Sequence, residues 1–220
     1  MKHFASFLLV CMLLHVHLLL AQVPVRDEPR HHNVLENKYI RLLDVWLKAG
    51  DTTMYHIHAT PSLFVILSNT YTTSQTKGES WVETKSTAGT TWYRSFQPDS
   101  LVHRVANIDT LPFHVNDIEI LSSFTGKAKA PLPFPIAFEN EKAYAYHITD
   151  PDTLSSLPIS NRGPMIAELV SGTNVFYMDN NTRQEKELVA GKYLYIEPGT
   201  SFRLAAKTKA AVNMVLFEIK

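Results

Sequence analysis

The sequence predicts an all-β protein, and three observations support this prediction. Short runs rich in Val, Ile, Thr, Tyr and Phe recur along the 220 residues, and Gly or Pro separates one run from the next. The runs are spaced by about 8–12 residues, which is typical of a β-sandwich or β-barrel. Beyond the first 21 residues, no segment shows the long apolar period of an amphipathic helix.

Four of these runs are the clearest strand candidates, and they cover residues 39–47, 63–67, 91–96 and 113–121. Each is rich in β-branched or aromatic residues, which suit a pleated sheet. The turn signals around them are Gly50, Pro61, Gly89, Pro98 and Pro112. These positions predict where one strand ends and the next begins.

The second half of the chain repeats features of the first at an offset of about 100 residues. An Asn opens an apolar run at Asn37 and again at Asn140, and the run after Pro61 resembles the run after Pro164. Residues 97–100 likewise resemble 197–200, and 117–120 resemble 216–219. Four anchors at similar offsets predict two copies of one β-unit.

The chain is expected to divide into four parts. Residues 1–21 are a predicted signal peptide, 22–126 an N-terminal unit, 127–136 a Pro-rich linker and 137–220 a C-terminal unit. The apolar run over residues 7–20 is too short and too early for a membrane span, as in export signals. The protein is therefore predicted to be secreted or periplasmic, with no membrane contact after cleavage behind Ala21.

Composition narrows the chemistry of the mature chain. Cys11 is the only cysteine and lies in the signal, so a metal would be held by His, carboxylate or carbonyl groups. Removal of the predicted signal peptide takes away one charged residue, Lys2, and leaves 20 basic and 21 acidic side chains in the mature chain. This balance gives no electrostatic reason to expect a nucleic acid or an anionic membrane as partner.

Two histidines are placed to act together. In a strand, His56 and His58 point to the same face, so both imidazoles can reach one point. With 10 His in the chain such a pair also arises by chance, as His15 and His17 in the signal show. The wider context of the pair is therefore decisive.

Gly50 lies six residues before His56, and Pro98, His103 and Asn107 follow further along the chain. This context resembles the cupin superfamily. Its first motif is Gly, five residues, His-x-His and then Glu, and its second motif centres on Pro-x-Gly, two residues, His, three residues, Asn. This sequence has the matching residues Gly50, His56, His58, Pro98, His103 and Asn107, with Ser100 at the usual Gly position. The resemblance implies a double-stranded β-helix (jelly-roll) barrel, here two units in tandem as a bicupin. It also implies a divalent metal at His56, His58 and His103.

The sequence departs from the cupin pattern at the glutamate, since Ser62 and Leu63 stand where that ligand is expected. Three neutral imidazoles would leave the metal its full charge and open positions for a small-molecule ligand or substrate. The metal would be Fe, Mn or Zn. Three-histidine iron sites in cupin-like dioxygenases make a dioxygenase-like activity the implied chemistry.

The C-terminal unit is expected to lack the metal site, because Ile159, Asn161 and Arg203 align with the three histidines. The remaining histidines are interpreted as residues without a role in metal binding. His31 and His32 are expected to be surface or rim groups, and His114 and His147 to be hydrogen-bonded strand residues. Arg104, Trp92, Tyr55 and Tyr93 are pocket-lining candidates or packing residues.

The function remains open among three hypotheses. The first is a metal-dependent enzyme, although no acid or base is identified beyond the chance that Asp117 or Glu119 faces inward. The second is a secreted cupin that binds a ligand without turnover, and the third is a barrel in which metal only fastens strands. Exposed sheet edges make a homodimer a further expectation.

Overall fold

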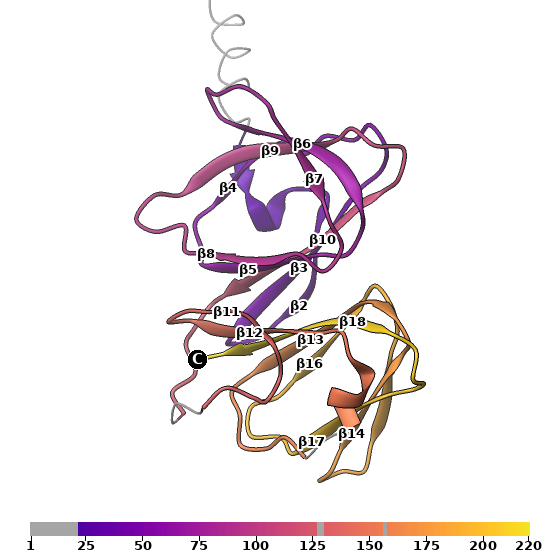
Figure 1. Ribbon diagram of the computed structural model, residues 1–220. Helices are drawn as coiled ribbons and strands as arrows, with labels where there is room; N and C mark the ends of the chain where they lie inside the picture. Colours follow the sequence, from indigo (N-terminus) through magenta and orange to yellow (C-terminus); the bar gives the residue numbers. More distant parts are fainter. Residues whose placement is uncertain (1–21, 127–129, 156–157) are drawn as a thin grey trace, which may run out of the picture.

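The computed structural model describes residues 22–126, 130–155 and 158–220 (Figure 1). These residues fold almost entirely into β-strands, so the all-β prediction is confirmed. The helical segments among them are two short 3-10 turns, η1 (Val25–Asp27) and η2 (Pro151–Ser155). In this part of the chain no helix is long and apolar enough to cross a membrane. The predicted signal peptide and linker residues 127–129 lie outside it.

The N-terminal half forms two five-stranded sheets that face each other. The β10 sheet has the order β2 (His31–Glu36), β3 (Ile40–Leu47), β10 (Phe113–Ile120), β5 (Ser62–Ile66), β8 (Thr91–Arg94). The β9 sheet has the order β1 (Gln22–Pro24), β4 (Tyr55–His58), β9 (Leu101–Asn107), β6 (Thr70–Thr76), β7 (Val82–Ser86). All neighbours pair antiparallel except β1 and β4. The four predicted strands correspond to β3, β5, β8 and β10.

The C-terminal half repeats this arrangement. Its larger sheet has the order β11 (Ile136–Glu139), β12 (Ala143–Ile148), β18 (Val212–Ile219), β13 (Met165–Gly172), β16 (Lys192–Ile196). Its smaller sheet has the order β15 (Glu185–Leu188), β14 (Val175–Asp179), β17 (Phe202–Ala206). The order β3-β10-β5-β8 thus recurs as β12-β18-β13-β16. The four sequence anchors fall at equivalent places in the two halves.

Strand β10 contacts both halves of the molecule because alternate side chains point to opposite faces. Phe113, Val115 and Asp117 face the space between the two N-terminal sheets. Ile118 and Ile120 face the other way and pack against side chains of β12, β13 and β18. Figure 1 shows the result, with the β10 sheet stacked on the larger C-terminal sheet.

The interiors of the two halves differ in how fully they are filled. The C-terminal interior is a continuous apolar cluster that includes Tyr146, Met165, Phe202 and Leu216. The N-terminal interior has a smaller apolar cluster around Leu47, Ile66 and Phe113. Beside that smaller cluster a cavity remains, and the histidines lie in it.

Candidate metal centre

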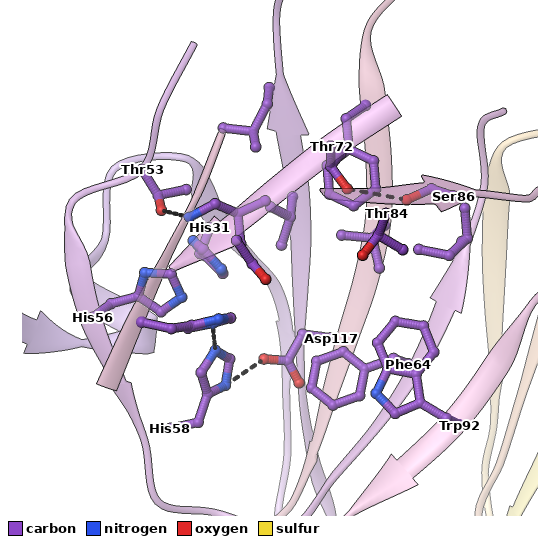
Figure 2. Close-up of a pocket in the computed structure, with 18 residues that line it drawn as sticks. His31, Thr53, His56, His58, Phe64, Thr72, Thr84, Ser86, Trp92 and Asp117 are labelled. Carbon is purple, nitrogen blue, oxygen red and sulfur yellow. Dashed lines mark hydrogen bonds and ion pairs between the residues drawn. The ribbon is translucent and has the colours of Figure 1, made fainter. Parts of the chain in front are cut away.

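The cavity lies between the β10 sheet and the β9 sheet and has a volume of about 190 Å³. Figure 2 shows its imidazoles gathered at one end and an aromatic pair at the other. Four histidines line it, namely His31, His56, His58 and His103. Three of them are the residues predicted from the sequence.

The strand register brings the three predicted histidines together. His56 and His58 lie on one face of β4 and are both buried. His56 is the direct cross-strand partner of His103 on β9. The ring centroid of His103 lies 4.6 Å from that of His56 and 5.0 Å from that of His58. The motif spacing therefore selects side chains that converge in the fold.

His31 is a fourth member of the cluster, and the expectation that it lies at the surface is wrong. It is buried at the start of β2, with its ring centroid 4.6 Å from that of His56, whereas His32 points outward and is exposed. One ligand atom from each of His31, His56 and His58 can be chosen so that all lie within 4.8 Å of one another. Consecutive side chains of a strand point to opposite faces, so one of the neighbouring residues His31 and His32 is expected to point inward. This alternation is the sequence signal that could have identified His31.

Glu28 holds His31 in this position. Its carboxylate accepts a hydrogen bond from Nδ1 of His31 at 2.7 Å and further ones from the backbone N–H groups of Arg30 and Met54. Burial opposes the charge on Glu28, but these bonds outweigh it and lower the pKa of Glu28 to about 2. Glu28 is therefore an ionised, buried anchor for the imidazole.

The Nδ1 atoms of His56 and His58 face groups outside the histidine cluster, a backbone carbonyl and the Asp117 carboxylate. Nδ1 of His56 lies 2.9 Å from the carbonyl oxygen of Met54, which can only accept, so that nitrogen carries the proton. Nδ1 of His58 lies 3.4 Å from Oδ2 of Asp117. Nε2 of His56 is buried and has no hydrogen-bond partner among the described residues. Such outer contacts fix ring orientation in metal sites.

The spacing of two Nε2 atoms that are hydrogen-bonded to each other also fits a shared metal ion. Nε2 of His58 lies 3.1 Å from Nε2 of His103. Metal–nitrogen bonds of about 2.0–2.1 Å place two neighbouring ligands of one ion roughly 3.0–3.4 Å apart, depending on geometry. The buried histidines can therefore hold a metal ion. Nothing in this donor set identifies which one.

Two of the histidines stay neutral well below pH 7. Burial, together with the nearby His31 and His58, lowers the pKa of His56 to about 3. Burial also lowers the pKa of His103 to about 2, again with contributions from the neighbouring imidazoles. Neutral imidazole is the form that binds metal, so these two residues are in the ligand state at physiological pH.

The rest of the cavity is aromatic, hydroxylic and acidic. Phe64 on β5 and Trp92 on β8 form a flat stacked pair, with centroids 4.7 Å apart and planes 9° apart. Hydroxyl side chains from β6 and β7 line it, among them Thr72, Thr84 and Ser86. Asp117 points into it from β10 (Figure 2).

Other sequence candidates lie elsewhere or serve the fold. Glu119 on β10 pairs with Arg41 at 2.6 Å rather than with the cavity. His114 and His147 are hydrogen-bonded strand residues as expected, to Asp44 at 2.7 Å and to Asn213 at 2.8 Å. The pocket-lining set is reduced to Trp92, because Tyr55, Tyr93 and Arg104 are absent from the cavity wall.

The C-terminal unit has apolar side chains at the equivalent place. Ile159 pairs with Phe202 as His56 pairs with His103, and both are buried in the apolar core. By this register Phe202, not the exposed Arg203, stands at the position of His103, a shift of one residue from the sequence alignment. Among residues 22–126, 130–155 and 158–220, the one group of three or more candidate ligands so close together is His31, His56 and His58, and His103 is not part of it.

Comparison with known proteins rests on structure alone. No protein-family model matches the chain, and no curated protein matches it. The protein Ylba from E. coli aligns over 87% of this chain and 85% of its own, with 11% identity and a TM-score of 0.61. A cupin 2 conserved barrel domain protein from Leptotrichia buccalis aligns over 86% and 88%, with 10% identity and a TM-score of 0.56.

An enzyme is also among the similar structures. Salicylate 1,2-dioxygenase from Pseudoaminobacter salicylatoxidans, in complex with gentisate, aligns over 82% of this chain and 69% of its own. The identity is 10% and the TM-score 0.52. At identities this low, the likeness shows a shared fold and leaves the function to be argued from the site.

Proposed function

Because the chain is a cupin by its fold, we propose that it is a secreted, metal-dependent enzyme of the non-haem dioxygenase type that acts on a small molecule. His56, His58 and His103 are the proposed metal ligands, joined by His31. The ion is Fe(II), Mn(II) or Zn(II), all of which accept imidazole ligands.

One observation carries this proposal. Four imidazoles from three strands meet in a cavity that also has room for a small molecule. Buried polar atoms in native proteins are nearly always paired, yet Nε2 of His56 is not. A metal ion satisfies that atom and its neighbours together.

The chain's own groups would perform three tasks in such an enzyme. Glu28, Asp117 and the carbonyl of Met54 orient the imidazoles. The neutral histidines leave the metal its full charge, which favours an anionic or chelating substrate. The stacked pair of Phe64 and Trp92 supplies an apolar wall against which a substrate can pack. A bound ion would supply Lewis acidity, and iron or manganese would also exchange electrons with dioxygen.

A specific observation favours a second candidate, a non-catalytic cupin in which the metal binds a ligand or only fastens strands. Four histidines are enough to close a tetrahedral zinc site, and closed sites are usually structural. A six-coordinate ion with the same four ligands would keep two open positions. The coordination number of the bound ion, four or six, therefore separates the two functions.

Two further parts of the proposal concern the whole protein. The apolar run over residues 7–20 supports secretion, and sequencing the mature N-terminus from culture medium or periplasm tests it. A homodimer is supported by the edge strand β7, where Trp81 and Val82 are exposed near its start. Sedimentation analysis tests the dimer.

The decisive experiment is elemental analysis of protein purified from its native compartment. About one equivalent of metal per chain is expected in the wild type. His56→Ala should lose it, and His147→Ala, which alters a hydrogen-bonded histidine of the other unit, should keep it. Absence of metal from the wild type contradicts the proposal. Dioxygen consumption with small anionic substrates then separates an enzyme from a binding protein.

A further inference from the structure

A polar crevice lies at the junction of the two units, apart from the histidine cavity. Its wall consists of residues 59–61 between β4 and β5, Gln97 after β8, residues 120–123 at the end of β10, and Lys142 before β12. Its volume is about 360 Å³, and none of the described residues lines both the crevice and the cavity. Lys142 comes from the C-terminal unit, whereas the other lining residues come from the N-terminal unit.

Among the described residues of this wall, Lys142 alone is charged, and it lacks a carboxylate partner. Lys142 is half-buried, and within the described residues its Nζ has one contact, to Oγ of Ser123 at 3.4 Å. The neighbouring Lys220, by contrast, pairs with Glu139 at 2.7 Å. An ammonium group has three N–H donors, so at least two are left for a partner from outside the chain.

The remaining polar groups of the wall are neutral and include several hydrogen-bond donors. The Ser123 hydroxyl oxygen accepts from Lys142, so its own hydrogen can be donated. The Thr60 hydroxyl and the Gln97 side-chain amide make no hydrogen bond to another described residue. Hydrogen bonds to an ionised oxygen are roughly twice as strong as those between neutral groups. A donor-rich wall with one cation and no acid therefore favours an anionic ligand and disfavours a cationic one.

We propose that the crevice binds a small oxyanion, in the form of a molecule with a phosphate or carboxylate group. Lys142 supplies the positive charge, and Thr60, Gln97 and Ser123 donate hydrogen bonds to the anionic oxygens. Because Lys142 belongs to the C-terminal unit, the bound anion links the turn between β11 and β12 to the N-terminal unit. The site goes beyond the proposed function, since its residues are distinct from the proposed metal ligands.

The first test titrates the wild type, as purified, with inorganic phosphate and separately with succinate. Sodium chloride keeps the ionic strength constant, so a general salt effect cancels. The backbone amide signals of Ser122, Ser123 and Lys142 in nuclear magnetic resonance spectra report binding at the crevice, and they should shift to a plateau. Saturation by phosphate alone assigns a phosphate group to the ligand, and saturation by succinate alone assigns a carboxylate group. Saturation by both assigns the oxyanion chemistry that the two probes share.

Three variants test whether the anion binds at Lys142. Lys142→Gln removes the charge and should weaken binding of the saturating probe by about 10- to 100-fold, as expected for loss of a charged hydrogen-bond partner. Lys142→Arg keeps the charge and should retain affinity within about 10-fold of the wild type. Lys192→Gln is the matched control, because Lys192 is an exposed lysine of the same unit, at the start of β16, and lies outside the crevice. It should leave the affinity unchanged.

Three results would overturn the inference. Shifts without a plateau for both probes mean that the crevice is not a binding site, and equal weakening in Lys142→Gln and Lys192→Gln means general charge screening. Unchanged affinity in Lys142→Gln means that the probe binds elsewhere, for instance at a bound metal. Metal content is measured on the same samples. A wild type without metal that still binds phosphate or succinate through Lys142 contradicts the proposed function and supports the oxyanion site, and the reverse result does the opposite.

Discussion

Nδ1 of His31 lies 2.7 Å from Oε2 of Glu28, and both side chains are buried beside the cluster of four histidines. The Glu28 carboxylate also accepts hydrogen bonds from two backbone N–H groups. These bonds hold the carboxylate in place, and the carboxylate in turn orients the imidazole of His31. A carboxylate that holds a histidine in this way usually raises the affinity of that histidine for metal. His31 therefore has the features of a ligand rather than of a rim residue.

Glu28→Gln should weaken metal binding by about 10- to 100-fold. The amide keeps the shape of the side chain but loses the charge that stabilises His31, and one of its two polar atoms can no longer accept. Competition with a chromogenic chelator measures the change. Glu83→Gln, at an exposed position of β7, is the control. Equal affinities in the two variants would contradict the role given to Glu28.

His31→Ala should lower metal affinity, whereas His32→Ala should not. The two residues are neighbours in β2, but only His31 points toward the cluster, and His32 is exposed. X-ray absorption at the metal edge should count one imidazole fewer in His31→Ala than in the wild type. Unchanged counts and affinities would restrict the site to the three histidines of the sequence motifs.

Much of the site follows from local patterns in the sequence. Alternation along a strand puts His56 and His58 on one face, and the spacing from Pro98 places His103 on the partner strand. The internal repeat likewise follows from local signals, because Pro61 and Pro164 each precede the equivalent buried strand. Patterns of this kind predict which side chains share a face.

The rest of the site depends on pairing between distant strands. His31 reaches the cluster because β2 pairs with β3, and Asp117 because β10 lies between β3 and β5. Neither register can be read from one sequence, since a shift of one residue would turn each side chain to the other face. The same effect places Phe202 rather than Arg203 opposite Ile159.

Metal removal should lower the thermal stability of the protein. The proposed ligands come from β2, β4 and β9, so one ion links the β10 sheet to the β9 sheet. A ligand that binds only the folded state stabilises it by about 4 kcal/mol at a thousand times its dissociation constant. Thermal unfolding with and without a chelator measures this, and a drop of several degrees is expected.

The His56→Ala variant provides the control for that measurement. It should unfold at the same temperature with and without chelator, because it has already lost the ion. A wild type indifferent to chelation, but shown to contain metal, would mean that the ion does not stabilise the contact between the sheets.

A buried acid at the contact between the two halves gives the stability a dependence on pH. Glu168 on β13 is fully buried, and both of its carboxyl oxygens lie 3.0 Å from Nδ2 of Asn116 on β10. Burial raises the pKa of Glu168 from 4.5 to about 8, although the bonds from Asn116 oppose the shift. The carboxyl group is therefore protonated in the folded protein at neutral pH.

The contribution of Glu168 to the free energy of unfolding should fall as the pH rises from about 4.5 to about 8, and below about pH 6.5 the neutral His56 and His103 oppose it, so the difference between wild type and Glu168→Gln is the quantity to compare. Across this window the folded protein holds a proton on Glu168 that the unfolded chain has released, so rising pH favours unfolding. The size of the effect is on the order of a few kcal/mol. Glu168→Gln keeps a neutral side chain at every pH and should remove most of this slope. Urea unfolding at pH 5, 6.5 and 8 measures it, with Glu185→Gln on the exposed strand β15 as control. If Glu168→Gln and the wild type lose stability in parallel, Glu168 is not the group that couples folding to pH.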